Sequence, residues 1–130
     1  MSSWHGKLHK KKSSGGKKRA YRTKRRFERG YFPAETVVGE HKTKTDRRRG
    51  ATTKVRLVST KFVNVSDLST GETKKTEILR VLKNPSNVDY DRRGVITKGT
   101  ILETSLGTVR VTSRPGQSGV LNAVVVSETT

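Results

Sequence analysis

The chain has 130 residues, of which 29% are apolar, so it is long enough for one modest domain but too polar to share a single core throughout. Its 29 Lys and Arg against 11 Asp and Glu give a formal net charge of +18, which exceeds what solubility requires and predicts a polyanionic partner. It has no cysteine, which excludes disulfides and thiolate metal sites. No apolar run approaches the roughly 20 residues that span a bilayer, and the basic start lacks the apolar stretch of a signal peptide. We therefore expect no membrane partner.

The first 50 residues are predicted to form a basic extension. The chain up to Arg56 holds 19 Lys and Arg against four Asp and Glu, so it carries nearly all the excess charge. Apolar residues are sparse up to about Gly30 and lack a spacing of three or four, so no helical face forms. We expect this extension to be largely irregular and disordered until bound.

Five clusters of cations in the extension favour RNA as the partner. Arginine forks onto phosphate oxygens and stacks on bases, lysine adds mobile charge, and Gly15 and Gly16 let the backbone approach an irregular surface. A single basic run is more often a solvated surface or a localisation signal, but five change the balance. If about ten phosphates are contacted, counterion release predicts a log–log salt slope of roughly −7 to −9. The predicted RNA-binding residues here are Lys10, Lys11, Lys12, Lys17, Lys18, Arg19, Arg22, Lys24, Arg25, Arg26 and Arg29.

Aromatic residues are interleaved with these cations and have two possible roles. Trp4, Tyr21, Phe27 and Tyr31 are candidates for stacking on unpaired bases. They would equally serve to anchor the extension to a folded domain. The sequence leaves both roles open.

A second basic group precedes and enters the first predicted strand. It is expected to fasten the folded domain to RNA, with Arg114 as a further cation in a turn. Arg92 and Arg93 also lie in a turn and are as compatible with an ordinary solvated loop. The predicted RNA-binding residues of this group are Lys42, Lys44, Arg47, Arg48, Arg49, Lys54 and Arg56, after His41.

Residues 51–130 are predicted to be an all-β domain. Apolar residues recur at every second position, as in Val63 and Val65 or Val109 and Val111, which is the spacing of half-buried strands. Turn-forming segments such as Asn84-Pro85-Ser86-Asn87 separate these runs. Closing about six or seven short strands into a small barrel removes exposed edges, although a sandwich fits the same pattern. The expected strands cover residues 53–59, 61–66, 74–83, 95–97, 100–104, 108–113 and 120–126.

The sequence gives no support for an enzyme, a cofactor or a small-molecule substrate. His5 and His9 have the spacing of two metal ligands on a helix, but Gly6 and the flanking lysines oppose such a site, so we expect no metal. The segment around Gly15 lacks the full phosphate-loop pattern. Asp89 and Asp91 are expected to cap turns or to balance nearby arginines.

The residues resemble a known family along almost the whole chain: the small-subunit ribosomal protein number eight of the archaeal and eukaryotic type, distinct from the bacterial protein that shares its number. The motifs that carry this resemblance are Trp4-His5-Gly6, Lys11-Lys12-Ser13-Ser14-Gly15-Gly16, Tyr21-Arg22-Thr23-Lys24-Arg25-Arg26-Phe27-Glu28, Pro33-Ala34-Glu35-Thr36 through Gly39, Arg49-Gly50, Asn84-Pro85-Ser86-Asn87, Lys98-Gly99-Thr100-Ile101, Ser113-Arg114-Pro115-Gly116-Gln117 and Val120-Leu121-Asn122-Ala123. The chain lacks the long internal insertion of eukaryotic members and so resembles the compact archaeal form. Gly30-Tyr31 departs from the Gly-Arg common in the family, which puts one phosphate contact in doubt.

The resemblance implies a structural, non-enzymatic protein of the small ribosomal subunit in the cytoplasm. Its barrel would pack on ribosomal RNA beside neighbouring ribosomal proteins, and its extension would run between RNA helices and help them pack during assembly. A general DNA-binding chromatin protein with a small barrel is the alternative, and an RNA-processing enzyme is a third class. The alternative requires comparable affinity for duplex DNA, and an enzyme requires a concave site with perturbed acids or a cofactor loop.

Overall fold

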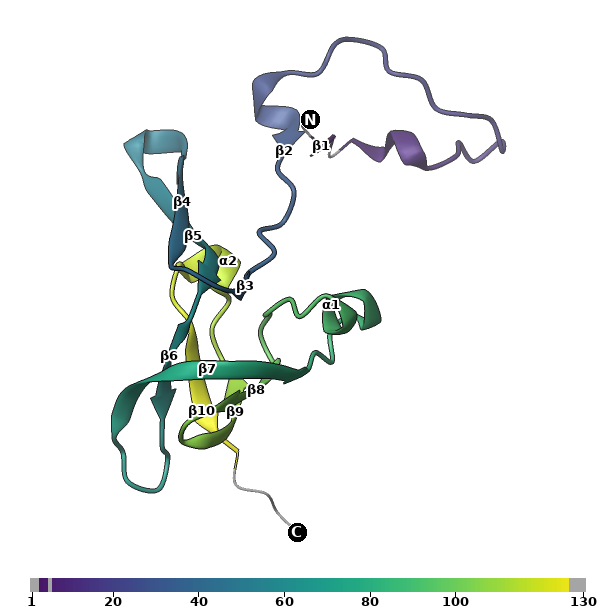
Figure 1. Ribbon diagram of the computed structural model, residues 1–130. Helices are drawn as coiled ribbons and strands as arrows, with labels where there is room; N and C mark the ends of the chain where they lie inside the picture. Colours follow the sequence, from purple (N-terminus) through teal and green to yellow (C-terminus); the bar gives the residue numbers. More distant parts are fainter. Residues whose placement is uncertain (1–2, 5, 127–130) are drawn as a thin grey trace. The chain divides into compact units, whose positions relative to one another are not determined.

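The computed structural model describes residues 3–4 and 6–126, and the chain divides into two compact units, Met1–Pro33 and Ala34–Thr130 (Figure 1). Residues 34–50, which the sequence assigned to the extension, belong to the second unit in this division. No helix in the described part of the chain is long and apolar enough to cross a membrane.

The first unit is a loop whose two ends are paired. Strand β1 (Ser3–Trp4) runs antiparallel to β2 (Arg29–Gly30), with Ser3 opposite Gly30. Two single 3-10 turns, η1 (Lys7–His9) and η2 (Arg26–Glu28), complete the regular structure in the described part of this unit. The polar composition explains why this unit has so little regular structure, because few apolar side chains are available to pack.

The second unit contains a closed five-stranded barrel, which confirms the predicted fold class. The strand order is β10-β6-β7-β8-β9, and the barrel closes where β10 pairs antiparallel with β9 and parallel with β6 (Figure 1). Closure gives every barrel strand two neighbours, so none of the five is an edge strand. The barrel strands are β6 (Phe62–Ser66), β7 (Thr73–Lys83), β8 (Ile101–Thr104), β9 (Gly107–Val111) and β10 (Asn122–Val125).

Two details of the strand prediction are wrong. The strand predicted at 53–59 exists as β5 (Thr53–Thr60), but it lies in a separate sheet of order β3-β5-β4, with β3 (Val37–Val38) and β4 (Lys42–Arg47). The segment 95–97 is not a strand. Ile96 makes only an isolated bridge to Thr36, whose carbonyl accepts the Ile96 N–H at 2.7 Å.

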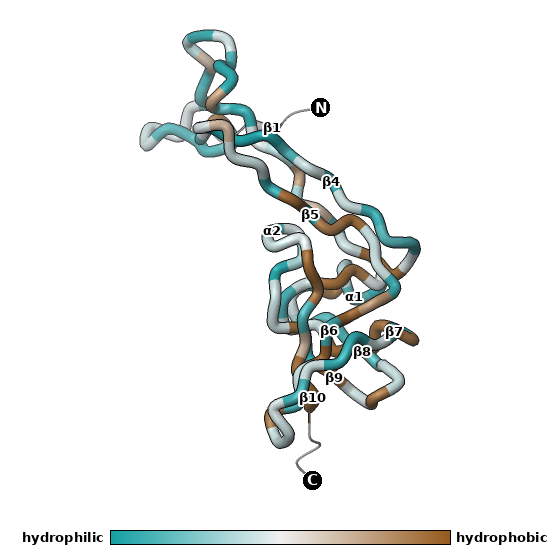
Figure 2. Tube along the Cα trace, turned by 90° about the vertical axis from the view of Figure 1, so that its left-hand side faces the viewer, coloured by the Kyte–Doolittle hydropathy of each residue, from teal (hydrophilic) through white to brown (hydrophobic). Residues whose placement is uncertain are grey.

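The core consists of the inward-facing half of the alternating pattern. Figure 2 shows brown, apolar segments along the strands of the second unit, whereas the first unit is mostly teal and white. Because the alternation survives on β6, β9 and β10, the predicted inward face is confirmed. The buried cluster comprises Leu57, Val63, Val65, Ile78, Ile96, Leu102, Val109, Val111, Leu121 and Ala123.

Two short helices decorate this unit, and polar residues fix the first. Helix α1 (Val88–Arg92) is capped by Asn87, whose side chain accepts the Asp89 N–H at 2.8 Å. Asp91 accepts the Asn84 N–H at 2.6 Å, and Asp89 pairs with Arg92 at 2.7 Å, so the expected capping and balancing roles are confirmed. The second helix is α2 (Pro115–Ser118).

Candidate nucleic-acid interface

The first unit gathers its cations around a tight turn. The Lys12 N–H donates to the Gly16 carbonyl at 2.8 Å, the Gly15 N–H donates to Lys12 at 3.0 Å, and Lys11 bridges Lys17. Gly15 has φ +82°, a conformation that glycine adopts without strain. The turn therefore brings two of the predicted clusters, 10–12 and 17–19, side by side.

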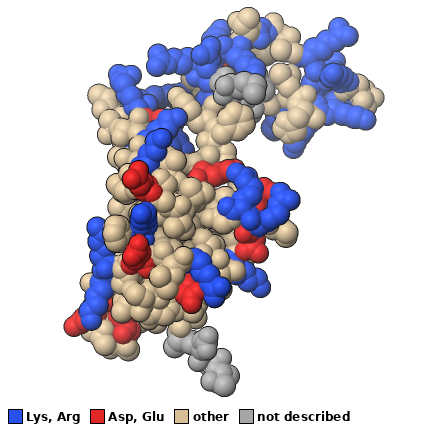
Figure 3. Space-filling view, viewed as in Figure 1, with Lys and Arg blue, Asp and Glu red and all other residues tan. Residues whose placement is uncertain are grey.

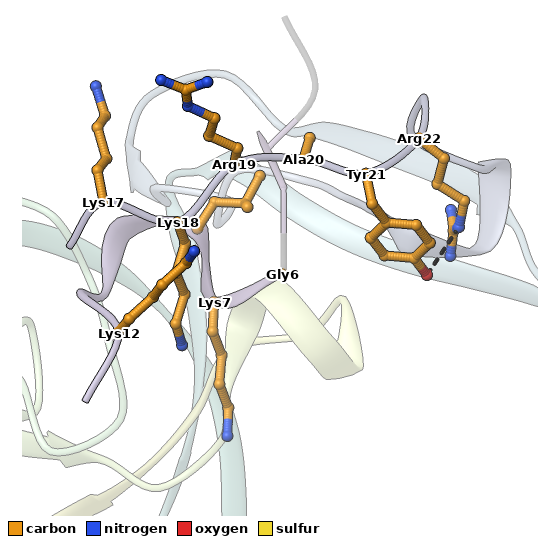
Figure 4. A pocket seen from close by; sticks show the side chains of 10 residues that line it. Gly6, Lys7, Lys12, Lys17, Lys18, Arg19, Ala20, Tyr21 and Arg22 are labelled. Carbon is orange, nitrogen blue, oxygen red and sulfur yellow. Dashed lines mark hydrogen bonds between the residues drawn. The ribbon is translucent and has the colours of Figure 1, made fainter. Parts of the chain in front are cut away.

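This loop borders an open pocket of about 710 Å³, and most of its lining residues are cations (Figure 4). In Figure 4 the side chains of Lys7 and Lys18 point to one side of the loop, and those of Lys17 and Arg19 point to the other. Like charges gathered on one short loop repel one another, and a bound anion would relieve that repulsion. The lining residues are Gly6, Lys7, Leu8, Lys12, Lys17, Lys18, Arg19, Ala20, Tyr21 and Arg22.

Glu28 organises the second half of the first unit. Both its carboxylate oxygens accept hydrogen bonds from the Arg22 guanidinium, one of them at 2.7 Å, and Oε2 also accepts the Arg25 N–H at 2.8 Å. The hydrogen bonds from Arg22 and then from Arg25 lower the pKa of Glu28 to about 2. The pKa of Arg22 is raised, first by Glu28 and then by the Tyr21 hydroxyl. Arg22 thus binds a carboxylate within its own unit, whereas the sequence predicted it only as an RNA-binding residue.

The remaining cations of this half are presented to solvent. Lys24, Arg25, Arg26 and Arg29 are exposed. Residues 1–33 contain twelve Lys and Arg but only one acidic residue, Glu28. In Figure 3 the first unit shows many blue side chains among tan ones, whereas the second unit shows red side chains among the blue ones.

The predicted stacking aromatics are accessible where the structure describes them. Tyr21 is 87% exposed, Phe27 60% and Tyr31 59%. The Arg22 guanidinium lies 5.0 Å from the centre of the Tyr21 ring, which orients that ring beside the cationic pocket. The side chain of Trp4 lies outside the described residues, as does His5.

The second basic group lies on a hairpin that the sequence did not predict. Strand β4 pairs antiparallel with β5, and its residues are almost all exposed. Figure 1 shows this hairpin extending beyond the barrel strands of the same unit. Its tip, η3 (Arg49–Ala51), turns through Gly50 at φ +70°. Threonine favours a strand, but no apolar alternation signals one in Lys42-Thr43-Lys44-Thr45.

The predicted RNA-binding residues on this hairpin differ in exposure and in whether they pair with other side chains of the unit. Lys42, Lys44, Arg47 and Arg49 are exposed, and Arg48 is partly exposed. Arg56 is buried, and its Nε donates to Asp46 Oδ2 at 2.8 Å. Lys54 donates to the side-chain oxygen of Gln117.

The turn arginines of the barrel unit also differ. Arg114 precedes α2 and is exposed. Arg93 pairs with Glu35 and with Asp89, and these two acids raise its pKa, Glu35 more strongly. Arg93 therefore has two acidic partners within this unit, although its side chain is 44% exposed.

The described residues show no metal-binding group of three His, Asp or Glu side chains. Comparison with known proteins identifies the family. The family model for ribosomal protein S8e matches residues 5–126. The chain belongs to the ribosomal protein S8e family.

Curated relatives support the family assignment over nearly their whole length. The small ribosomal subunit protein eS8 of Methanocorpusculum labreanum is 46% identical over 123 residues, covering 95% of this chain and 98% of the relative. The proteins of the same name from Methanoregula boonei and Ignicoccus hospitalis are 44% and 47% identical, each covered to 98%. The resemblance to the compact archaeal form is confirmed.

Membership of this family settles the broad class of the protein. It is a ribosomal protein of the small subunit, a structural component and not an enzyme, and its place is in the ribosome of the cytoplasm. The motifs identified in the sequence carried this assignment correctly.

Proposed function

We propose that the protein binds small-subunit ribosomal RNA through two basic surfaces. The first is the loop surface, made by Lys10–Lys12, Lys17–Arg19, Lys24–Arg26 and Arg29. The second is the hairpin surface, made by Lys42, Lys44 and Arg47–Arg49. Arg22, Lys54 and Arg56 each donate a hydrogen bond to a side chain of their own unit. Their main role is to stabilise these surfaces and not to contact phosphate.

One observation carries the proposal. The first unit has twelve cations against a single carboxylate, and that carboxylate is already engaged by Arg22 and the Arg25 N–H. Bound phosphates would relieve the repulsion among the remaining cations and release counterions. The geometry suits a polyanion with an irregular surface, because the cations lie on both sides of an extended loop.

The loop surface would assist assembly by reducing the repulsion between RNA phosphates. By screening phosphates on adjacent RNA helices, the loop surface would allow those helices to pack closely, while the hairpin surface fastens the barrel unit beside neighbouring ribosomal proteins. Phosphate contacts of this kind give affinity without sequence readout.

A competition assay tests the proposal. Full-length protein is titrated with small-subunit ribosomal RNA at several salt concentrations, with duplex DNA of equal phosphate content as competitor. We expect a steep salt slope of roughly −7 to −9 for about ten contacts, and a preference for the RNA. Equal displacement by duplex DNA would favour a general DNA-binding protein instead.

A further inference from the structure

A second cavity lies within the barrel unit, between β5, β6, β7 and the segment after α2. Its volume is about 400 Å³, which falls within the range of roughly 300–1,000 Å³ typical of small-ligand sites. Leu57 and Leu121 line it and are buried, whereas Phe62 and Val120 line it and remain 45% and 48% exposed. It is therefore an open hollow with an apolar base.

Phe62 faces this cavity because of the strand alternation. Val63 and Val65 of β6 point into the barrel core and are each 1% exposed, so Phe62 and Asn64 point outward. The Phe62 ring is therefore not part of the buried core. Lys75 on β7 places its Nζ 4.7 Å from the centre of the Phe62 ring, which holds an ammonium at the cavity.

Asn64 adds directional polar groups. Its Nδ2 donates to Asn122 Oδ1 at 3.0 Å, which fixes the plane of the amide. An amide in this orientation still offers the Asn64 carbonyl oxygen as an acceptor. His41 and Thr60 also line the cavity, and none of its nine lining residues, all within the described part, is acidic. Glu77 lies opposite Phe62 in the β6–β7 register but does not line the cavity.

We propose that this cavity receives one unpaired nucleobase of the bound RNA. The inference deepens the proposed function and rests on it. Phe62 would stack on the base, and Asn64 Oδ1 would accept a hydrogen bond from an exocyclic amino group or ring N–H. Lys75 would turn to the adjoining phosphate. Proteins recognise single-stranded RNA in this way, by stacking on splayed bases and reading their edges. A single base pocket would give the otherwise non-specific phosphate contacts a fixed register.

The experiment compares two single-stranded RNA probes of equal length at high salt, one with bases and one abasic, so that phosphate contacts are the same. Wild-type protein should bind the base-containing strand more tightly. The Phe62→Leu variant should lose at least about fivefold of that preference, the effect of one stacking contact, and Phe62→Trp should retain it. An unchanged preference in Phe62→Leu overturns the inference.

A matched pair of lysine variants tests the same site without altering its apolar wall. Lys75→Met and Lys83→Met remove the same charge from the same strand, but only Lys75 lines the cavity. We expect Lys75→Met to weaken binding of the base-containing probe more than Lys83→Met does, and this comparison decides the matter should Phe62→Leu fail to fold. Equal effects contradict the base pocket. If wild-type protein binds neither probe nor ribosomal RNA, the proposed function itself fails, whereas RNA binding with unaffected variants overturns only the pocket.

Photocross-linking identifies the occupant in the assembled particle. A benzophenone amino acid is placed at position 62 of the full chain, which is incorporated into small subunits and irradiated. A cross-link to RNA supports the inference. A cross-link to another ribosomal protein shows that the hollow receives a protein side chain and overturns it.

Discussion

Arg56 Nε donates to Asp46 Oδ2 at 2.8 Å, and the two side chains are only 11% and 13% exposed. The pair joins β4 to β5 near the tip of the hairpin that presents Lys42, Lys44 and Arg47. An arginine that resembles its basic neighbours in the sequence thus acts within the fold. Removing its partner would leave a guanidinium largely buried without a counter-charge.

Asp46→Asn should therefore lower the free energy of unfolding by about 2–3 kcal/mol, since the buried cation loses its carboxylate. Urea denaturation of the full-length protein measures this difference. Lys44→Ala is the control, because Lys44 is 63% exposed and lies 3.9 Å from the same carboxylate, and its loss should cost under about 0.5 kcal/mol. Equal effects would show that the Arg56 pair does not stabilise the hairpin.

Replacing Lys24, Arg25 and Arg26 together with glutamine should weaken RNA binding and make the log–log salt slope shallower by about 2–3, since three phosphate contacts are lost. Thermal unfolding of the barrel unit should stay nearly unchanged. Neutralising Lys61, Lys83 and Arg110, which are exposed on the barrel unit, removes the same charge and should alter the slope less. A large fall in melting temperature for the first variant would contradict the division of roles.

The pKa of Glu28 should be measurable directly by NMR of its carboxyl group. Because the folded pKa of about 2 lies below the ordinary value of about 4.3, the contribution of this carboxylate to the 22–28 turn is present above the ordinary value and is lost as pH falls towards 2. In Arg22→Gln the titration midpoint should move up towards the ordinary value. An unchanged midpoint would mean that Arg22 is not the main cause.

Gly119→Ala should destabilise the barrel unit more than Gly71→Ala. Both glycines have nearly the same φ, +74° and +72°, but a Cβ at 119 would lie 2.9 Å from Val55 Cγ1, whereas nothing lies within 4 Å at 71. The shared backbone cost is about 1 kcal/mol, and the clash should add about 1–2 kcal/mol at 119. Similar losses in urea denaturation would show that α2 shifts freely from β5.

Val111→Asp should abolish cooperative unfolding of the barrel, because Val111 is 1% exposed within the core and an unpaired carboxylate there costs more than about 4 kcal/mol. Arg110→Asp, on the outward face of the same strand, serves as the control and should fold normally. Circular dichroism during heating distinguishes the two outcomes. Normal folding of Val111→Asp would contradict the inward assignment.

The barrel was predictable because apolar residues occupy alternate positions, as Val63 and Val65 or Val109 and Val111 show. Strand β4 was not, because its lysines and threonines form a strand only by pairing with β5. The prediction at 95–97 failed because Val95 and Ile96 are buried without belonging to a strand. Ile96 makes only an isolated bridge, so adjacent apolar residues here do not indicate a ladder. Composition located the basic surfaces but could not distinguish Arg56 and Arg22, whose acidic partners lie 10 and 6 residues away. Nor did it reveal the cavity at Phe62, since its lining comes from segments between His41 and Leu121.

Gradient sedimentation of a cell lysate at low and high salt tests whether the loop surface binds RNA in the small subunit. It follows the full-length chain beside the variant lacking charge at Lys24, Arg25 and Arg26. We expect the full-length chain to stay with the small subunit through the salt wash and the variant to be loosened or lost. If the full-length chain travels with chromatin or free in solution, or if both chains resist the wash equally, RNA binding through the loop surface is contradicted.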